Sequence, residues 1–321
     1  MSESKIWVIV ERSGEGLTTT SLELLTKARE MSTELAAIAW GGDATDVARQ
    51  VGAYGARSLY HVLLGSDVLP GEVVAGSIAP MCEVEKPEAI LVPTSYDGRD
   101  IVARLSVKID RPVLANVAGL EDDDGLVTLH QVFGGTQTLR ARFDAPGVAL
   151  IVVRAKSFVA SSIEDPPAEI IEIVAPRVTK RQARVVARHV QTRSGPKLED
   201  SAVVVSGGRG IGDGEKFALI EEVARLLGGA AGASRAVVDA GWVPYSRQIG
   251  QTGKTVKPDV YIACGISGAT QHVVGMKASK KIIAINRDAE APIFQYADLG
   301  VVGDLNVILP KLIASLSQRG A

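Results

Sequence analysis

Short apolar runs alternate with amphipathic stretches along the first 175 residues of the chain. The apolar runs predict strands at residues 6–10, 35–39, 58–63, 89–92, 113–117, 126–132, 148–153 and 170–173. Between the early runs, segments such as "TTSLELLTKAREM" and "GRDIVARLSVKI" repeat apolar residues at the helical period. Alternating strands and helices predict a parallel sheet covered on both faces. The helical pattern is missing from about residue 120 to 160, so we expect antiparallel strands at the edge of this sheet.

A second series of strands and helices begins near residue 202. "SAVVVSGGRG" predicts a strand ending in a glycine turn, and "DGEKFALIEEVARLLGG" predicts a helix. Further strands are predicted at "SRAVVDAG", "PDVYIACG", "KKIIAINRD" and "LGVVGD", with a closing helix at "DLNVILPKLIASLSQ". Residues 176–200 are polar, basic and interrupted by Pro and Gly, which is typical of an inter-domain connection. We therefore predict an α/β protein of two domains, residues 1–195 and 196–321, each a mostly parallel sheet with helices on both faces.

Composition, net charge and cysteine spacing exclude several classes of binding partner and site. Hydrophobic residues make up 46% of the chain and aromatics 4%, and the formal net charge of −2 argues against nucleic acid or an anionic membrane as a partner. No run approaches the roughly 18 apolar residues of a membrane-spanning helix, and "MSESKIWVIVERSGEG" resembles a first strand more than a signal peptide. Cys82 and Cys264 have no metal-like spacing. We expect a cytoplasmic protein without a metal site.

Residues 203–214 combine a strand with a glycine-rich turn. The glycines at 207, 208, 210, 212 and 214 do not have the spacing of the dinucleotide-binding fingerprint. The turn could direct free backbone N–H groups and a helix N-terminus toward a phosphate. It could equally be a turn that requires only the backbone freedom of glycine. Both interpretations remain open.

The stretch "IGQTGKTVKPDVYIACGISGATQH" (residues 249–272) places glycine turns on both sides of one apolar strand. In its second turn, Ser267 is placed to cap a helix starting near Gly268, with His272 close to the N-terminus of that helix. Small or polar residues also follow the later strands, in "AINRDAEAP" and "VVGDL". Ligands of open α/β sheets lie beyond the carboxyl ends of the strands. Several such turns predict a long ligand with phosphates in its middle, such as a dinucleotide.

The side chains near these turns favour a flavin over a nicotinamide. The C-terminal half contains no Ser-His-Asp arrangement and no paired carboxylates at catalytic spacing, so no catalytic residue is predicted. Its cationic and hydroxyl groups are those of Arg209, Arg235, Thr252, Ser267 and His272. Such groups suit a cofactor that gains negative charge, as a flavin does when it forms an anionic semiquinone. A nicotinamide-dependent oxidoreductase and a nucleotide-sensing module remain as alternatives.

At this point the sequence resembles the alpha subunit of electron transfer flavoprotein. The resemblance lies in "VVVSGGRG", "GASRAVVDAGWVP", "QIGQTGKTVKPDVYIACGISGATQHVVGMKAS" and "IIAINRDAEAPIFQYADLGVVGDL", within residues 202–310. It implies a Rossmann-like FAD-binding C-terminal domain and an N-terminal domain that docks a beta subunit in a heterodimer. It also implies an electron carrier without its own substrate turnover. Such a carrier serves dehydrogenases, such as the acyl-CoA dehydrogenases of fatty acid β-oxidation, and a quinone oxidoreductase. An electron-bifurcating NADH-dependent complex is the alternative within the family.

The resemblance also assigns residues to the cofactor. Arg235 is expected against the isoalloxazine, Thr252 near flavin N5, and His272, with an ordinary pKa near 6.5, near the O2 edge. The groups expected on ribityl, pyrophosphate or adenosine are Arg209, Ser234, Gln251, Ser267, Asn286 and Asp304. The predicted binding set also includes Ile249, Gly250, Gly265, Gly268, Ala269, Thr270, Gln271 and Leu305.

The remaining candidates are interpreted as structural or as departures from the family pattern. "PTSYDGRD" is expected to cap a helix, and Gly134 and Gly135 to form a bulge or tight turn. His61, His130 and His189 have no partner pattern and are taken as structural. Departures from the family pattern are Cys264 and the loop of Tyr245, Ser246 and Arg247. Arg247 is expected to add positive charge near the cofactor.

Overall fold

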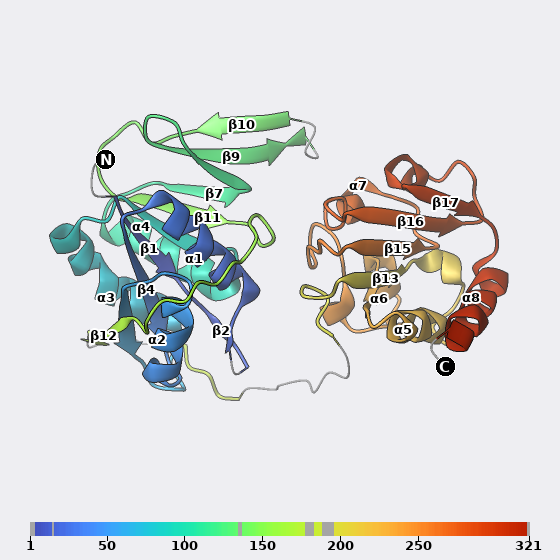
Figure 1. The fold of residues 1–321 in the computed structure, drawn as a ribbon, viewed down its shortest axis with the longest axis horizontal. Coiled ribbons are helices and arrows are strands. Elements are labelled where there is room, and N and C mark those ends of the chain that lie inside the picture. Colours follow the sequence, from blue (N-terminus) through green and yellow to red (C-terminus); the bar gives the residue numbers. More distant parts are fainter. Residues whose placement is uncertain (1–3, 15, 134–136, 177–182, 188–195, 320–321) are drawn as a thin grey trace. The chain divides into compact units, whose positions relative to one another are not determined.

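The computed structural model describes residues 4–14, 16–133, 137–176, 183–187 and 196–319. The chain divides into two compact units, Met1–Val190 (unit 1) and Gln191–Ala321 (unit 2). Each unit contains a parallel sheet with helices (Figure 1), so the predicted α/β fold class is confirmed. Much of the predicted linker, and the boundary predicted after residue 195, falls on residues 177–182 and 188–195, outside the described residues. Every helix in the described part of the chain is too short or too polar to cross a membrane.

Unit 1 is built on a seven-stranded sheet in which every neighbouring pair is parallel. In spatial order its strands are β12 (Glu169–Val174), β5 (Ser58–Leu63), β4 (Glu34–Trp40), β1 (Lys5–Ile9), β6 (Ala89–Pro93), β11 (Ala149–Val153) and β7 (Val113–Val117). Helices α1 (Thr19–Met31) and α2 (Ala44–Gly52) contribute to the core on one face. Helices α3 (Pro70–Glu85) and α4 (Tyr96–Lys108) cover the other face. A short hairpin of β2 (Arg12–Ser13) and β3 (Gly16–Leu17) follows β1.

The helices of unit 1 begin where the sequence supplies a cap. Thr18 and Asp43 accept backbone hydrogen bonds at the starts of α1 and α2. Ser95 Oγ accepts the Gly98 N–H at 2.8 Å at the start of α4, so the predicted cap in "PTSYDGRD" is confirmed. Such a cap typically stabilises a helix by about 1 kcal/mol.

The antiparallel strands of unit 1 form a sheet of their own. Strands β8 (Gly119–Asp122), β9 (Leu126–Val132) and β10 (Gln137–Ala141) pair only with one another. The prediction that they extend the edge of the main sheet is therefore wrong. The chain leaves β7 with Asn116 in the left-handed region (φ 60°), and the pairing of β7 with β11 is irregular there. Gly134 and Gly135 lie outside the described residues.

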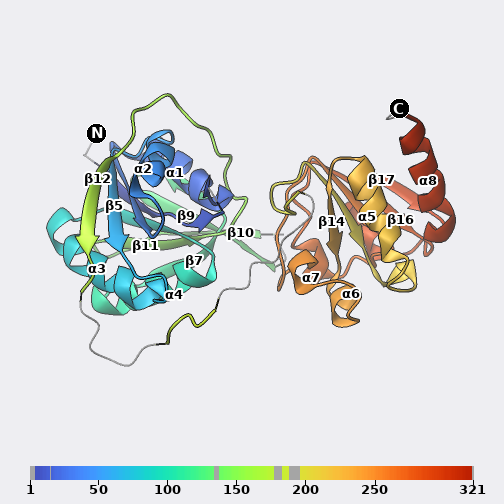
Figure 2. The same ribbon diagram turned by 90° about the horizontal axis from the view of Figure 1, so that it is seen from below.

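Unit 2 contains a five-stranded parallel sheet. Its order is β14 (Ala230–Ala233), β13 (Val203–Gly207), β15 (Val260–Cys264), β16 (Lys281–Asn286) and β17 (Leu299–Val302). Helices α5 (Phe217–Leu226), α6 (Arg235–Asp239) and α8 (Leu305–Arg319) supply the core of one face (Figure 2). The opposite face is covered by the loops around α7 (Thr270–Val273) and the 3₁₀ turn η4 (Pro292–Tyr296). Two further 3₁₀ turns are η2 (Arg209–Ile211) and η3 (Tyr245–Arg247).

The segment "SRAVVDAG" is a helix and not the predicted strand. The strand of this region is the preceding "AAGA" of β14, whose small residues gave only a weak strand signal. Ser234 is extended, and the chain then turns into α6. Within α6, Arg235 and Asp239 form an i,i+4 ion pair at 3.2 Å, and Val237 packs into the core. The two adjacent β-branched valines of this segment therefore favoured a strand in the prediction, although the segment forms a helix.

Candidate functional site

The carboxyl ends of the strands of unit 2 lie at one edge of its sheet, because all five strands are parallel. The predicted site residues follow those ends. They are Arg209 after β13, Ser234 and Arg235 after β14, residues 265–272 after β15, Asn286 at the end of β16, and Asp304 and Leu305 after β17. Residues 249–252, which precede β15, bond to residue 271 and so join this edge. The structure therefore brings the sequence-predicted set to one side of one sheet.

The first glycine turn is closed by backbone packing. Gly208 N donates to Cys264 O at 2.8 Å, and Gly210 N donates to Gly265 O at 3.0 Å. A Cβ atom on Gly210 would lie 2.7 Å from Gly265 Cα, and one on Gly208 would overlap the Gly265 carbonyl. These N–H groups are already bonded, and the next long helix, α5, starts only at Phe217. Of the two interpretations of this turn, the structural one is correct for Gly208 and Gly210.

The two turns that flank β15 pack against each other. Gln251 N donates to Gln271 O at 2.7 Å, and a Cβ on Gly250, whose φ is +139°, would lie 2.7 Å from the same carbonyl. A Cβ on Gly275 would lie 2.5 Å from Gly250 N. Glycine is required on both sides of the strand because two backbone segments meet there without room for side chains.

A run of unpaired backbone donors follows this contact. None of the backbone hydrogen bonds among the described residues uses the N–H of Ser267, Gly268, Ala269 or Thr270 as its donor. The side chains of residues 267, 269 and 270 are exposed. Gly268 has a φ of +91° and lies against the backbone of Ile293, whose N–H bonds to Ser267 O at 3.0 Å. Successive free N–H groups at a turn form a concavity that suits an anion such as a phosphate.

Ser267 does not cap a helix at Gly268 as predicted. Helix α7 begins at Thr270, its N-cap position is Ala269, and no side chain bonds to its first turn. The helix has four residues, with His272 third among them. His272 therefore lies near a helix N-terminus, as expected, but the helix is a single turn that starts two residues later than predicted, and the surroundings of His272 must set its properties.

His272 is buried beside a tyrosine. Only 7% of the residue is exposed, and its Nε2 lies 2.8 Å from the hydroxyl oxygen of Tyr261 on β15. Its Nδ1 is buried and has no hydrogen-bond partner within the described residues. Burial lowers the pKa of His272 to about 4, and the backbone of Ile249 only partly opposes this. The imidazole is therefore uncharged at neutral pH, and its Nδ1 is the ring nitrogen without a partner.

Tyr261 was not identified from the sequence as part of the site. It occupies the apolar run of β15, where a tyrosine is unremarkable as a core residue. The signal that could have identified it is its hydroxyl, because a fully buried phenol needs a hydrogen-bond partner.

The cationic side chains at this edge have different surroundings. The side chain of Arg235 is 68% exposed and bonds to Asp239 within its own helix. Arg247 is ion-paired with Glu221 of α5, and its guanidinium lies 5.9 Å from the centre of the Phe217 ring. The positive charge that Arg247 was expected to add is thus balanced by a carboxylate. Arg209 is exposed.

The polar groups around these cations are tied to the backbone and to one another. Thr252 accepts a hydrogen bond from buried Gln248 at 2.9 Å, and its carbonyl accepts one from the Tyr245 hydroxyl. Asn286 donates to Ile266 O at 3.0 Å, which links the end of β16 to the turn after β15. Asp304 accepts the Asn306 N–H at 2.9 Å ahead of α8. These bonds give all three site residues a structural role, and their contacts with a cofactor stay a prediction.

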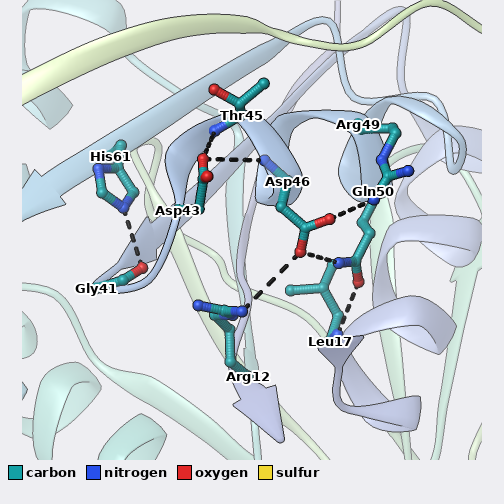
Figure 3. A network of polar contacts seen from close by, with 9 residues as sticks. All are labelled: Arg12, Leu17, Gly41, Asp43, Thr45, Asp46, Arg49, Gln50 and His61. Atoms are coloured by element: carbon teal, nitrogen blue, oxygen red, sulfur yellow. Dashed lines mark hydrogen bonds and ion pairs between the residues drawn. The ribbon is translucent and has the colours of Figure 1, made fainter. Parts of the chain in front are cut away.

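The corresponding edge of unit 1 is occupied by its own polar network (Figure 3). Asp43 caps α2, and Asp46 lies between Arg12, at 4.0 Å, and the Gln50 amide, at 2.8 Å. His61 Nε2 lies 3.1 Å from Gly41 O, beside a shallow hollow lined by Gly41, Gly42, His61, Leu63, Leu64 and Gly65.

The second described histidine of unit 1, His130, is bonded within its own strand. His130 Nε2 lies 2.8 Å from Thr128 Oγ1 within strand β9. His189 lies outside the described residues.

Two family models together match most of the chain. The model described as "Electron transfer flavoprotein FAD-binding domain" matches residues 197–277, and "Electron transfer flavoprotein domain" matches residues 6–187. The chain is 40% identical to the electron transfer flavoprotein subunit alpha of Mycobacterium leprae over 320 residues, covering 97% of this chain and 98% of that protein. It is 38% identical to the Mycobacterium tuberculosis subunit alpha, covering 98% and 99%. It is 34% identical to that of Thermoanaerobacterium thermosaccharolyticum, covering 98% of each.

Proposed function

We propose, because the chain belongs to the electron transfer flavoprotein family as an alpha subunit, that its FAD lies along residues 267–272 at the carboxyl edge of the unit 2 sheet. The observation that carries this proposal is the run of unpaired N–H groups at residues 267–270, three of which belong to exposed residues, followed by the buried, unpartnered Nδ1 of His272. A dinucleotide needs both features, an anion-binding turn for its pyrophosphate and a polar contact for its ring. The bound flavin supplies the capacity to accept and release one or two electrons.

The residues have separate tasks in this proposal. The backbone of Ser267–Thr270 binds the pyrophosphate, and His272 offers Nδ1 to the polar edge of the isoalloxazine. Arg235 and Thr252 lie on exposed parts of the same edge and provide a cation and a hydroxyl beside the ring. Arg209, Ser234, Gln251, Asn286 and Asp304 hold the ribityl and adenosine parts.

The carrier function requires partners that this chain does not contain. We propose a heterodimer with a beta subunit, acyl-CoA dehydrogenases as electron donors and a quinone oxidoreductase as acceptor. The family name supports the first, since an alpha subunit implies a second subunit. We place the chain in the cytoplasm, because both cysteines, Cys82 and Cys264, are buried free thiols, as in a reducing compartment.

Anaerobic mixing tests this function. The chain, purified with its beta subunit, is mixed with an acyl-CoA dehydrogenase and its acyl-CoA substrate, and the visible flavin bands are followed. We expect the bands of the carrier to bleach and to return when a quinone oxidoreductase is added. Bleaching by NADH alone would favour the bifurcating alternative, and no bleaching by either donor would contradict the carrier function.

Arg235→Ala is expected to retain FAD and to lower the potential of the first electron. A cation beside the ring favours the reduced, negatively charged cofactor over the oxidised one. The effect should be on the order of 1 kcal/mol, because Arg235 is exposed and paired with Asp239. Arg225→Ala is the matched control, since Arg225 on α5 is 67% exposed and paired with Glu222. A reductive titration in which both variants have the same potential would show that Arg235 does not act on the flavin.

A further inference from the structure

We propose that Tyr261 is a positioning residue, which holds His272 through Nε2 so that an Nδ1–H donor faces the flavin. The proposal rests on the function proposed above, in which His272 contacts the isoalloxazine. It adds a residue outside the predicted binding set, from the strand beneath the turn.

The geometry fixes which ring nitrogen is available. Tyr261 is fully buried and its hydroxyl oxygen lies 2.8 Å from His272 Nε2, with the two ring centres 6.2 Å apart and tilted by 56°. Since Nε2 is used, Nδ1 is the only ring nitrogen that can meet a ligand. Nδ1 has no partner in the described chain, and a buried polar atom without a partner destabilises the protein. A ligand contact at Nδ1 would remove that cost.

The direction of the hydrogen bond follows from the protonation states. Burial raises the pKa of the Tyr261 phenol, and the nearby Ser206 hydroxyl only partly opposes it, so the phenol keeps its proton. Burial also keeps His272 neutral. A buried phenol hydrogen needs an acceptor, and the lone pair of Nε2 is at the right distance. When Tyr261 donates to Nε2, the imidazole proton lies on Nδ1.

The groups that act on the pair carry no charge. Ser206 on β13 and Cys264 on β15 act on Tyr261, and the backbone of Ile249 acts on His272. The Cys264 thiol is uncharged, because burial raises its pKa to about 12. If His272 gains a proton, the Tyr261 hydroxyl can turn and accept from Nε2–H, so the ring keeps its position in either state.

Nitrogen NMR of ¹⁵N-histidine-labelled protein, purified with its beta subunit, tests the proposal. The chain has four histidines, and the signals of His272 are identified by their loss in His272→Gln. In flavin-free wild type we expect His272 in the Nδ1–H form. In Tyr261→Phe, which removes only the hydroxyl, the ratio of Nδ1–H to Nε2–H should fall about fivefold, as expected from losing one hydrogen bond. Tyr60→Phe, which removes a phenol hydroxyl from unit 1, should leave the ratio unchanged.

Addition of FAD separates this proposal from the function on which it rests. We expect FAD to bind both wild type and Tyr261→Phe, and to shift the Nδ1–H resonance of the wild type. An Nε2–H form in wild type, or an equal ratio in Tyr261→Phe, would overturn the role of Tyr261 while FAD still binds. Bound FAD that leaves the resonance unmoved would overturn the contact of His272 and the positioning role with it. Failure of the wild type to bind FAD would instead overturn the proposed function.

Discussion

Replacing Gly268 with alanine is expected to destabilise unit 2 by roughly 2–5 kcal/mol and to abolish FAD retention during purification. Gly268 has a φ of +91°, which an L-residue rarely adopts. Its added Cβ would lie 2.6 Å from Ile293 Cα, and the nearest atoms all belong to the backbone of Pro292 and Ile293, so no flexible side chain can yield. Any relief of that clash must move residues 267–270, whose N–H groups are proposed to bind the pyrophosphate.

Gly228→Ala is the matched control for this prediction. Gly228 also has a positive φ, +62°, but an added Cβ would meet no atom within 4 Å. The control should therefore show backbone strain alone, about 1 kcal/mol, with FAD retained. Urea unfolding and FAD titration of the two variants provide the comparison. Equal losses of stability and equal FAD affinities would show that close packing at Gly268 does not shape the site.

His272→Gln is expected to remove a pH dependence from both stability and redox potential. In the folded chain burial lowers the pKa of His272 to about 4, against about 6.5 when unfolded. Between these values the unfolded state binds more protons, so wild-type stability should fall as pH falls from about 6.5 to 4, by roughly 3 kcal/mol in total. Glutamine does not titrate, so the variant should lack this loss.

His272 is also expected to control the pH dependence of the redox potential. Negative charge gained by the flavin raises the pKa of a neighbouring His272. Between the pKa near 4 of the folded chain and the higher pKa expected beside a reduced flavin, electron uptake should bring proton uptake, and the first-electron potential should fall by up to about 59 mV per pH unit as pH rises. Potentials of the wild type, His272→Gln and the unit 1 control His130→Gln are to be measured across this range. Parallel curves for all three would show that His272 is only a packing residue.

The sequence predicted the fold class better than individual elements. Alternating apolar runs and amphipathic helices determine two parallel α/β sheets, because both faces of each sheet must be covered. The strand predicted at "SRAVVDAG" was wrong because adjacent valines suit a strand and a core-facing helix alike. The separate sheet of β8, β9 and β10 follows a left-handed residue, Asn116, and no local pattern in the sequence reveals either feature.

The partners of the glycine turns in the site could not be predicted from the sequence either. The sequence shows where glycines occur, but it does not show whether an N–H faces a ligand or another strand. Gly208 and Gly265 are 57 positions apart, and only the tertiary fold brings their backbones into contact. The bond between Tyr261 and His272 also depends on the path of the chain from β15 through the turn.

The visible absorption spectrum of the wild-type chain purified with its beta subunit tests the central claim most directly. The claim is that the unpaired N–H groups at residues 267–270 and the buried Nδ1 of His272 form an FAD site. We predict a yellow protein with flavin bands, and the loss of those bands in Gly268→Ala but not in Gly228→Ala. A colourless wild-type protein that binds NAD, or a Gly268→Ala variant that keeps its full flavin content, would contradict it.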